Sequence, residues 1–268
     1  MINKIIFRQY DIRGIVNKEL TKENSKLIGY YLGLTIKEKY PQITPYIIVG
    51  YDIRTHSQML FEALISGINL SNCKVLDIGL VATGVNYFAS FQEYEINNKT
   101  IKPTASIMIT GSHNAKKYNG FKITINNEPF FGDELIDLYE KISKDSEIKI
   151  ADNFDVIKID AKSLYIDYML NQFSHLKDFP IPFIIDCGNG VANTVLCEVL
   201  DKLNLNYKGL HLVPDGEFPN HHPDPTNEKN LEDLKVLLKD EYNLGFAYDG
   251  DADRIAVLTQ KYNIKGDM

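Results

Sequence analysis

The sequence contains no tryptophan and only three cysteines, Cys73, Cys187 and Cys197, in 268 residues. The cysteines are odd in number, lie far apart and form no Cys-x-x-Cys pair, which argues against a disulfide framework and predicts buried thiols. No apolar run approaches the roughly 20 residues that a membrane-spanning helix needs, and the N-terminal segment lacks the apolar core of a signal peptide. We therefore expect a cytoplasmic protein with no membrane partner.

Positively charged residues are outnumbered by negatively charged ones. The sequence has 29 Lys and Arg and 36 Asp and Glu, which gives a formal net charge of −7. Proteins that bind nucleic acid through its phosphates show a basic face, whereas the densest basic spot near any candidate site here is the pair Lys116-Lys117. No nucleic-acid partner is predicted. The apolar content of 44% is typical of a globular chain that buries a core.

Apolar runs alternate with helical patterns along the chain. We expect a helix over 21–39 with Thr21 as its N-cap, and a second helix that begins at Ser57 with Ser57 as its N-cap. Further helices are expected over 133–142, over 161–173, in a segment that ends at Val199, and over 231–239. Strands are expected at 46–50, 74–78, 105–110, 121–125, 183–186, 245–248 and 255–259. This alternation predicts two consecutive three-layer α/β domains with mixed, mostly parallel sheets. A polar stretch at 143–160 is typical of a linker, so the predicted domains are 1–150 and 151–258. Residues 259–268 would begin a truncated third domain.

The strongest local signal is an acidic loop, AYDGDADR, at residues 247–254. Asp249, Asp251 and Asp253 alternate with small residues directly after an apolar strand. Clustered carboxylates repel one another, and a hard divalent cation such as Mg²⁺ relieves that repulsion. The loop also leaves the carboxyl end of a strand, where α/β folds bind ligands. A phosphatase of the haloacid dehalogenase type, with Asp249 as nucleophile, fits the same loop.

A second signal is TGSHN at 110–114, which continues to KKYNGFKI. Ser112 follows Gly111 in a strand-to-loop turn, where a small neighbour permits close approach of a bulky group. A serine can carry a phosphoryl group when a cation neutralises the transferring phosphate. His113 and Lys122 are nearby donors. Because the chain also contains a carboxylate cluster, this turn predicts that Ser112 takes part in a reaction.

Four motifs occur in an order that is shared with a known family: FRQYDIRG at 7–14, TGSHNAKKYNGFKI at 110–123, EFPNHHPDP at 217–225 and DGDADR at 249–254. In this order they resemble the α-D-phosphohexomutases, and the opening motif is similar to the phosphomannomutase/phosphoglucomutase branch. The motifs together cover nearly the whole chain. The resemblance implies an isomerase of carbohydrate metabolism that moves phosphate between O1 and O6 of a hexose phosphate, through a phosphoserine and a 1,6-bisphosphate.

The resemblance also implies residue roles. Ser112 would carry the phosphoryl group and, with Asp249, Asp251 and Asp253, would hold Mg²⁺. Arg13 and Lys122 would serve the substrate hydroxyl and phosphate, including proton transfer, and Tyr10, His113 and Arg254 would line the site. Arg54 matches the family's VGxDxR stretch and would support the Ser112 loop. Glucose or mannose 1,6-bisphosphate would act as activator.

The sequence departs from the family pattern in two ways. Ala115 replaces the proline that usually follows Ser-His-Asn, which removes no reactive group. The sugar-recognition string of GExSGH type and the phosphate-binding string of RxSNTxP type are both absent. We therefore expect an N-terminal fragment that is inactive alone and exposes apolar surface, through which it self-associates.

Two alternatives stay open at this point: the phosphatase that uses Asp249, and a truncated protein that binds metal and phosphosugar without turnover. His221 and His222, flanked by prolines, could in principle bind metal. Adjacent histidines point apart on an extended segment, so a rigid structural loop is the favoured interpretation.

Overall fold

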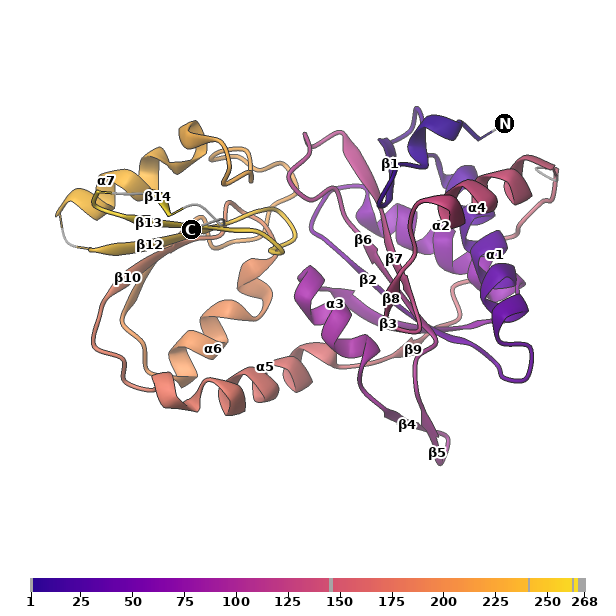
Figure 1. The fold of residues 1–268 in the computed structure, drawn as a ribbon, viewed down its shortest axis with the longest axis horizontal. Coiled ribbons are helices and arrows are strands. Elements are labelled where there is room, and N and C mark those ends of the chain that lie inside the picture. Colours follow the sequence, from indigo (N-terminus) through magenta and orange to yellow (C-terminus); the bar gives the residue numbers. More distant parts are fainter. Residues whose placement is uncertain (1, 145–146, 241, 262, 265–268) are drawn as a thin grey trace.

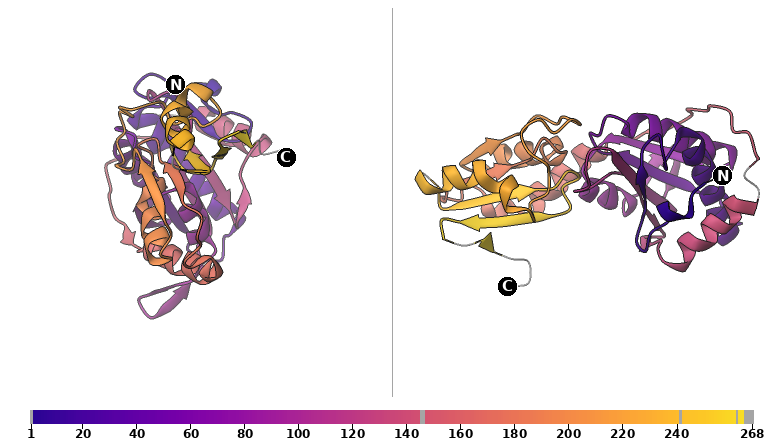
Figure 2. Two further views of the ribbon diagram at one scale, coloured as in Figure 1. Left: turned by 90° about the vertical axis from the view of Figure 1, so that its left-hand side faces the viewer. Right: turned by 90° about the horizontal axis from the view of Figure 1, so that it is seen from above.

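Two α/β units follow one another along the chain and lie side by side along its longest axis (Figures 1 and 2). The structure is a computed structural model, and it describes residues 2–144, 147–240, 242–261 and 263–264. None of the helices in these ranges is long and apolar enough to cross a membrane. Two α/β units with mixed sheets confirm the predicted fold class.

The first unit is built on a mixed sheet in the order β1-β7-β6-β2-β3-β9, with β8 beside β7. Its strands are β1 (Ile12–Ile15), β2 (Tyr46–Tyr51), β3 (Lys74–Leu80), β6 (Ala105–Ile109), β7 (Tyr118–Ile125), β8 (Glu128–Pro129) and β9 (Ile157–Lys158). The helices α1 (Lys22–Lys39), α2 (Ser57–Leu70) and α4 (Asp133–Lys144) cover one face, and α3 (Thr83–Ser90) and α5 (Ala161–Gln172) the other. A hairpin of β4 (Tyr94–Ile96) and β5 (Lys99–Ile101) projects from this unit, and a 3₁₀ turn (Lys4–Ile6) precedes β1.

The second unit has the strand order β11-β10-β12-β13-β14. Its strands are β10 (Phe183–Asp186), β11 (Tyr207–Leu210), β12 (Leu244–Tyr248), β13 (Ile255–Thr259) and β14 (Asn263–Ile264). Helix α7 (Glu232–Asp240) covers one face and α6 (Leu196–Lys202) the other. Short 3₁₀ turns occur at Ser174–Leu176, Ala192–Thr194 and Glu228–Leu231, so the helix expected to run up to Val199 is divided into a turn and α6.

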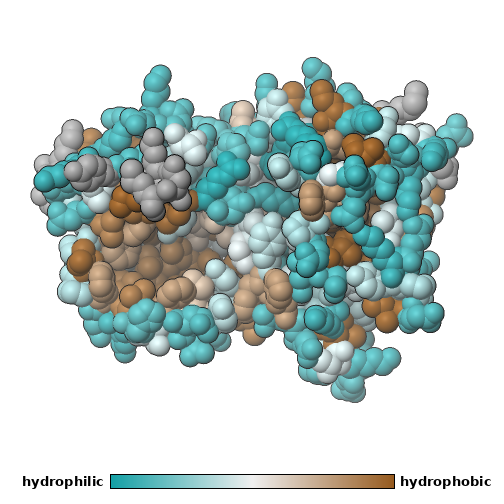
Figure 3. Space-filling model, in the orientation of Figure 1, coloured by the Kyte–Doolittle hydropathy of each residue, from teal (hydrophilic) through white to brown (hydrophobic). Residues whose placement is uncertain are grey.

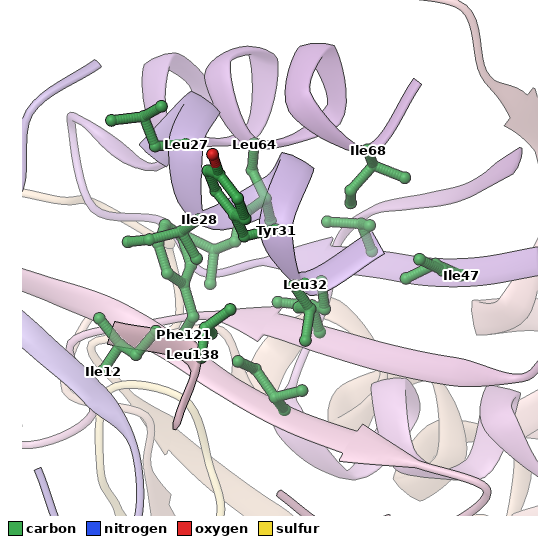
Figure 4. Close-up of a cluster of buried hydrophobic side chains, with 14 of the residues drawn as sticks. Ile12, Leu27, Ile28, Tyr31, Leu32, Ile47, Leu64, Ile68, Phe121 and Leu138 are labelled. Carbon is green, nitrogen blue, oxygen red and sulfur yellow. The ribbon is translucent and has the colours of Figure 1, made fainter. Parts of the chain in front are cut away.

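The core of the first unit forms where α1 and α2 pack on the sheet (Figure 4). Alternate residues of β2 enter opposite cores, with Ile47 and Val49 facing α1 and α2 and Ile48 facing α3. This alternation is the period-two pattern of a strand that is buried on both faces. Leu32 and Ile28 of α1 are fully buried in the same cluster. The connection between β6 and β7 therefore leaves a strand that is packed on both faces, since Ile107 and Ile109 of β6 lie in one core and Met108 in the other.

Parallel pairs run from β6 to β9 in the first sheet and from β11 to β12 in the second, while the other end of each sheet is antiparallel, so the sheets are mixed as predicted. β7 pairs antiparallel with β6, and β13 pairs antiparallel with β12. Each of these pairs is joined by a connection of a few residues, which is too short for the crossover that parallel neighbours require. The Ser112 turn is the first of these connections, and the Asp249 loop is the second.

Other expectations differ in detail. Thr21 caps α1 as predicted, because its Oγ1 accepts from the N–H of Asn24. Ser57 is not a cap: it lies inside α2, the N-cap position is His56, and the Ser57 hydroxyl donates to Asp52 instead. Within the stretch expected to be a linker, β9 pairs in parallel with β3 of the first sheet.

At the other end of the chain, Asn263–Ile264 pairs with β13 in the second sheet. The rest of the expected third-domain segment, 265–268, lies outside the described residues. Of the three cysteines, Cys73 and Cys187 are buried as predicted and Cys197 is half-buried.

One face of the second sheet is only partly covered. Leu244, Phe246 and Tyr248 point from β12 toward the α6 side, where they remain half-buried. Figure 3 shows apolar residues gathered in a hollow on this part of the molecule. An apolar surface of this kind on a folded domain is typical of a docking surface.

Candidate active site

Two loops that are far apart in the sequence meet between the units. Ser112, in the β6–β7 connection, donates its hydroxyl hydrogen to Oδ2 of Asp249, in the β12–β13 connection, over 2.9 Å. The loops fit closely, since a Cβ on Gly250 would lie 2.8 Å from the carbonyl oxygen of Ser112. Glycine is therefore required at this position of the acidic loop.

The Ser112 loop is held in an uncommon conformation. Ser112 has φ = 49°, in the left-handed region that a non-glycine residue rarely adopts, and its side chain is buried. Strain of this kind persists only where the surroundings enforce it. The buried Arg54 enforces it, because its guanidinium donates to the carbonyl oxygens of Ser112 (2.8 Å) and Asn114 (2.6 Å), and also to those of Ala115 and Tyr118.

Asp52 fixes the start of the same loop. Its Oδ2 accepts from the Thr110 hydroxyl (2.9 Å) and the Gly111 N–H (3.0 Å) and lies 3.3 Å from Nε of Arg54. The buried Asp52–Arg54 pair thus anchors the turn from both ends. A Cβ on Gly111 would fall 2.1 Å from Nε of Arg54, so the small residue before Ser112 makes room for the guanidinium.

The three loop carboxylates converge at one point. Asp249, Asp251 and Asp253 each place an oxygen within 4.8 Å of the others. Burial, and then the negative charges of Asp251 and Asp253, raise the pKa of Asp249 above its ordinary value. Oδ1 of Asp251 is buried and has no hydrogen-bond partner among the described residues. This oxygen is therefore a buried acceptor that is available to a ligand.

Lys122 is the nearest cation to these carboxylates. Its Nζ donates to Asp251 (2.6 Å) and to Asp253 (2.5 Å). Burial acts to lower the pKa of Lys122, but the charges and hydrogen bonds of the two carboxylates outweigh burial and raise it above its ordinary value. In the structure, Lys122 is thus an ammonium that balances part of the negative charge of the loop.

A cleft of ≈ 810 Å³ opens above Ser112, within the size range of small-molecule sites. Arg13 is buried in its wall and pairs with Asp11 through Nε and Nη2, whereas its Nη1 has no partner among the described residues. Arg254 donates to Nδ1 of His113 over 2.5 Å. Burial and the Arg254 charge lower the pKa of His113 below its ordinary value, so this imidazole is neutral near pH 7.

The structure brings the predicted site residues together. Its cleft is lined by Tyr10, Arg13, Ser112, His113, Lys122, Asp253 and Arg254, and Asp249 and Asp251 lie buried beneath its floor. Tyr10 is 76% exposed and stacks on Phe131 at the rim. Sequence reasoning missed Asp52 and Thr83. Thr83, at the start of α3, donates to Asp251 from behind over 2.6 Å.

Comparison with known proteins identifies the family. Residues 4–149 match the family model described as phosphoglucomutase/phosphomannomutase, alpha/beta/alpha domain I, and residues 163–263 match domain II. The chain belongs to the phosphoglucomutase/phosphomannomutase family. Membership of this family counts against the haloacid dehalogenase alternative.

Curated members of the family are similar over most of this chain. A phosphomannomutase/phosphoglucomutase of Pseudomonas aeruginosa is 35% identical over 95% of the chain and 52% of its own length. A phosphoglucomutase of Neisseria meningitidis is 38% identical over 98% of the chain and 55% of its own length. The chain thus spans about half the length of the curated family members that it matches.

A solved structure of a phosphoglucomutase/phosphomannomutase family protein from Burkholderia thailandensis superposes with a TM-score of 0.90 at 31% identity. The match covers 100% of this chain and 57% of that one. A structure titled putative phosphomannomutase, from Thermus thermophilus, superposes with a TM-score of 0.84 at 22% identity and supports the fold alone.

Proposed function

We propose that this chain supplies the phosphoserine and metal loops of a phosphohexomutase, an isomerase that moves phosphate between O1 and O6 of a hexose phosphate. The observation that carries the proposal is the 2.9 Å contact between Ser112 Oγ and Asp249 at the floor of a cationic cleft. A nucleophilic hydroxyl, a carboxylate cluster and a buried guanidinium with a free N–H are the groups that phosphoryl transfer requires. The names of the family members agree with it.

Asp249, Asp251 and Asp253, with Ser112, would hold Mg²⁺. The donor set fits this cation, because it consists of oxygens alone and includes the unpartnered, buried Oδ1 of Asp251. When bound, Mg²⁺ neutralises charge on the transferring phosphoryl group. The unpartnered Nη1 of Arg13 would donate to a phosphate oxygen, as a guanidinium does well.

In the proposed reaction, the free O1 or O6 hydroxyl oxygen of the sugar forms a bond to phosphorus as the bond between phosphorus and Ser112 Oγ breaks. The product is a hexose 1,6-bisphosphate, which reorients and returns its other phosphate to Ser112. Because a hexose 1,6-bisphosphate phosphorylates Ser112 in this scheme, added glucose or mannose 1,6-bisphosphate would also act as activator of the enzyme. Arg254 and His113 would contact the phosphoserine, and Tyr10 would contact the sugar from the rim.

The proton of the attacking hydroxyl must also move. We assign this transfer to Lys122, with Arg13 beside it. In the structure Asp251 and Asp253 hold Lys122 as an ammonium, so Lys122 would have to release one hydrogen to solvent before it accepts the proton of the sugar hydroxyl. The pKa of Lys122 would fall when the same carboxylates hold Mg²⁺, and this favours that release. Lys122 would pass the proton of the sugar hydroxyl to Ser112 Oγ, the leaving oxygen of the same half-reaction. In the other half-reaction the direction reverses, because Oγ attacks and gives up its hydrogen and the departing sugar oxygen receives one.

Mutase turnover would need more than these two loops. The family's sugar-recognition and distal-phosphate strings do not occur in the sequence, so the chain alone would accept a phosphoryl group without efficient isomerisation. If isomerisation by the chain alone is absent altogether, the chain would still bind metal and phosphosugar without turnover. Self-association also stays a prediction, and the apolar hollow beside β12 is the face on which it would occur.

Phosphorylation of Ser112 tests the proposal. After incubation with glucose 1,6-bisphosphate and Mg²⁺, peptide mass mapping should place one phosphate on Ser112 and none in the Ser112→Ala variant. Asp249→Asn should also abolish labelling, although its serine is intact. A label on Asp249 would support the phosphatase chemistry instead, and no label in the wild type would refute the assignment of Ser112.

A further inference from the structure

A second group of metal-binding side chains lies at the carboxyl edge of the second sheet. Asp186 ends β10, and His211 directly follows β11, the parallel neighbour of β10. His221 reaches the same point from the loop that precedes α7. One possible ligand atom from each residue lies within 4.8 Å of the others. The acidic loop at Asp249 is separate from this group and shares no residue with it.

The hydrogen bonds of His221 set the state of its ring. Its Nδ1 lies 3.0 Å from the carbonyl oxygen of His222, and since a carbonyl only accepts, Nδ1 carries the hydrogen. In the neutral imidazole, Nε2 is then a bare lone pair, and it points at Oδ2 of Asp186 over 3.0 Å. Two lone pairs that face each other at this distance need a positive charge between them, either a proton or a metal ion.

Asp186 is placed as a fixed ligand. Its carboxylate is fully buried, and its Oδ1 accepts from the N–H of Gly188, which leaves Oδ2 for His221. Because desolvating a carboxylate is costly, Oδ2 of Asp186 needs a positively charged partner, which a metal ion would supply. A histidine that binds a metal usually donates the hydrogen of its other ring nitrogen to a carbonyl or carboxylate, as His221 does to the His222 carbonyl oxygen.

His211 supplies the third side of the site. Its backbone has φ = 49° and is fixed by the Asn189 N–H, which donates to the His211 carbonyl oxygen over 2.9 Å. Its ring lies edge-on to that of His221, with centroids 5.0 Å apart, and its Nε2 lies 3.0 Å from Asp233 of α7. Asp233 is thus the neighbouring carboxylate that would orient the ring or complete the ligand set.

We propose that Asp186, His211 and His221 form a second metal site, for Zn²⁺ or a similar transition-metal ion, distinct from the oxygen-only loop at Asp249. Two imidazoles and a carboxylate suit zinc, whereas magnesium prefers oxygen ligands. Metal–ligand bonds of about 2.0–2.2 Å separate neighbouring ligands by little more than the 3.0 Å found between His221 and Asp186.

The site would stabilise the loop that supports the phosphoserine turn. The next residue, His222, points away from His221 and donates from Nε2 to the carbonyl oxygen of His113 over 2.6 Å. The two adjacent histidines thus point apart, as expected from the sequence, and have different partners. His221 would bind metal, and His222 would hold the residue beside Ser112.

Cobalt titration of the whole chain in saturating Mg²⁺ tests the site, because Co²⁺ bound to imidazoles at low coordination number absorbs visible light strongly. One equivalent should produce this absorption, and Zn²⁺ should displace it, since zinc binds such sites more tightly than cobalt. His211→Gln and His221→Gln should each weaken cobalt binding by roughly tenfold or more. His175→Gln is the matched control, because His175 is exposed and belongs to neither cluster, and it should bind like the wild type.

Three results would overturn the proposal. They are no strong absorption in the wild type, full absorption in both histidine variants, and loss of absorption in Asp251→Asn, which would place the cobalt in the acidic loop. If a histidine variant does not fold, X-ray absorption at the zinc edge of the wild type decides. Two imidazole nitrogens are expected there, and an all-oxygen shell would contradict the site.

Discussion

Thr83 donates its hydroxyl hydrogen to Oδ2 of Asp251 over 2.6 Å, and its backbone N–H donates to the backbone carbonyl of the same residue over 2.9 Å. The contact joins the start of α3, in the first unit, to the acidic loop of the second. Because Thr83 and Lys122 both occupy Oδ2, the free lone pairs of Asp251 are those of Oδ1. Thr83 is therefore a positioning residue for Asp251, the proposed metal ligand.

Thr83→Val should weaken Mg²⁺ binding by roughly 10-fold to 100-fold, the usual cost of removing an outer partner of a metal ligand. Valine keeps the shape of threonine but cannot donate, so Asp251 becomes free to turn. Calorimetric titration with Mg²⁺ measures the change. Thr83→Ser retains the hydroxyl and should bind within a few-fold of the wild type, and equal weakening in both variants would contradict the positioning role.

Asp249→Asn should stabilise the metal-free chain at neutral pH. The pKa of Asp249 is raised by burial and by its neighbours above the ordinary 3.8, so the folded state holds a proton that the unfolded state has lost. Stability must then fall as pH rises from 3.8 to the raised pKa. Asparagine removes this penalty, and a gain of ~1 kcal/mol would raise the melting temperature by roughly 2–4 °C.

The gain should be absent near pH 3, where the folded and unfolded states are both protonated at this residue. Mg²⁺ should raise the melting temperature of the wild type and leave that of Asp249→Asn almost unchanged. Melting curves with and without Mg²⁺ at both pH values test this. A variant that is less stable than the metal-free wild type at pH 7 would show that the hydrogen bonds of Asp249 outweigh carboxylate repulsion.

Arg54→Ala should destabilise the fold by about 3–5 kcal/mol, because it leaves the buried Asp52 without its counter-ion. Arg54→Lys should also lose phosphorylation of Ser112, since an ammonium cannot serve the four carbonyl oxygens that the planar guanidinium contacts. Denaturant unfolding and mass mapping measure the two effects. Arg8→Ala, at an exposed arginine, should change stability by less than about 0.5 kcal/mol.

A coupled assay on glucose 1-phosphate and mannose 1-phosphate should show only trace mutase turnover by this chain. Positioning of both ends of a substrate can lower a barrier by roughly 7–11 kcal/mol, and the strings that would hold the far phosphate are absent from the sequence. Turnover near the usual range of about 1–10³ per second would show that these 268 residues bind the whole substrate.

The two loops could be predicted from the sequence because each keeps its chemistry within a few consecutive residues. Ser112 and the three aspartates stand in short motifs that follow buried strands, and strand periodicity places those motifs at sheet edges. The support residues could not be found in this way. A threonine before a helix is usually a cap, and only the packing of two units shows that Thr83 reaches Asp251, 168 positions away.

The helix start at Ser57 shows the same limit. The residue type fits a cap, but Asp52 offers the serine hydroxyl a better acceptor at 2.6 Å. Asp52 itself is needed at the Ser112 turn, so a tertiary network overrode a local preference. Likewise, the sequence predicts mixed sheets but does not show which pairs are antiparallel. These include the two pairs that the Ser112 and Asp249 loops connect, because short connections force their strands to run antiparallel.

The contact between Ser112 and Asp249 spans 137 positions of the chain, and this separation has a consequence during synthesis. A ribosome that has released only the first unit has already produced the serine turn and its Arg54 anchor, but no carboxylate that can receive the hydroxyl hydrogen. Domains generally fold as units from the N-terminus. The serine turn of the nascent chain therefore stays without the Asp249 carboxylate until the second unit has emerged and docked.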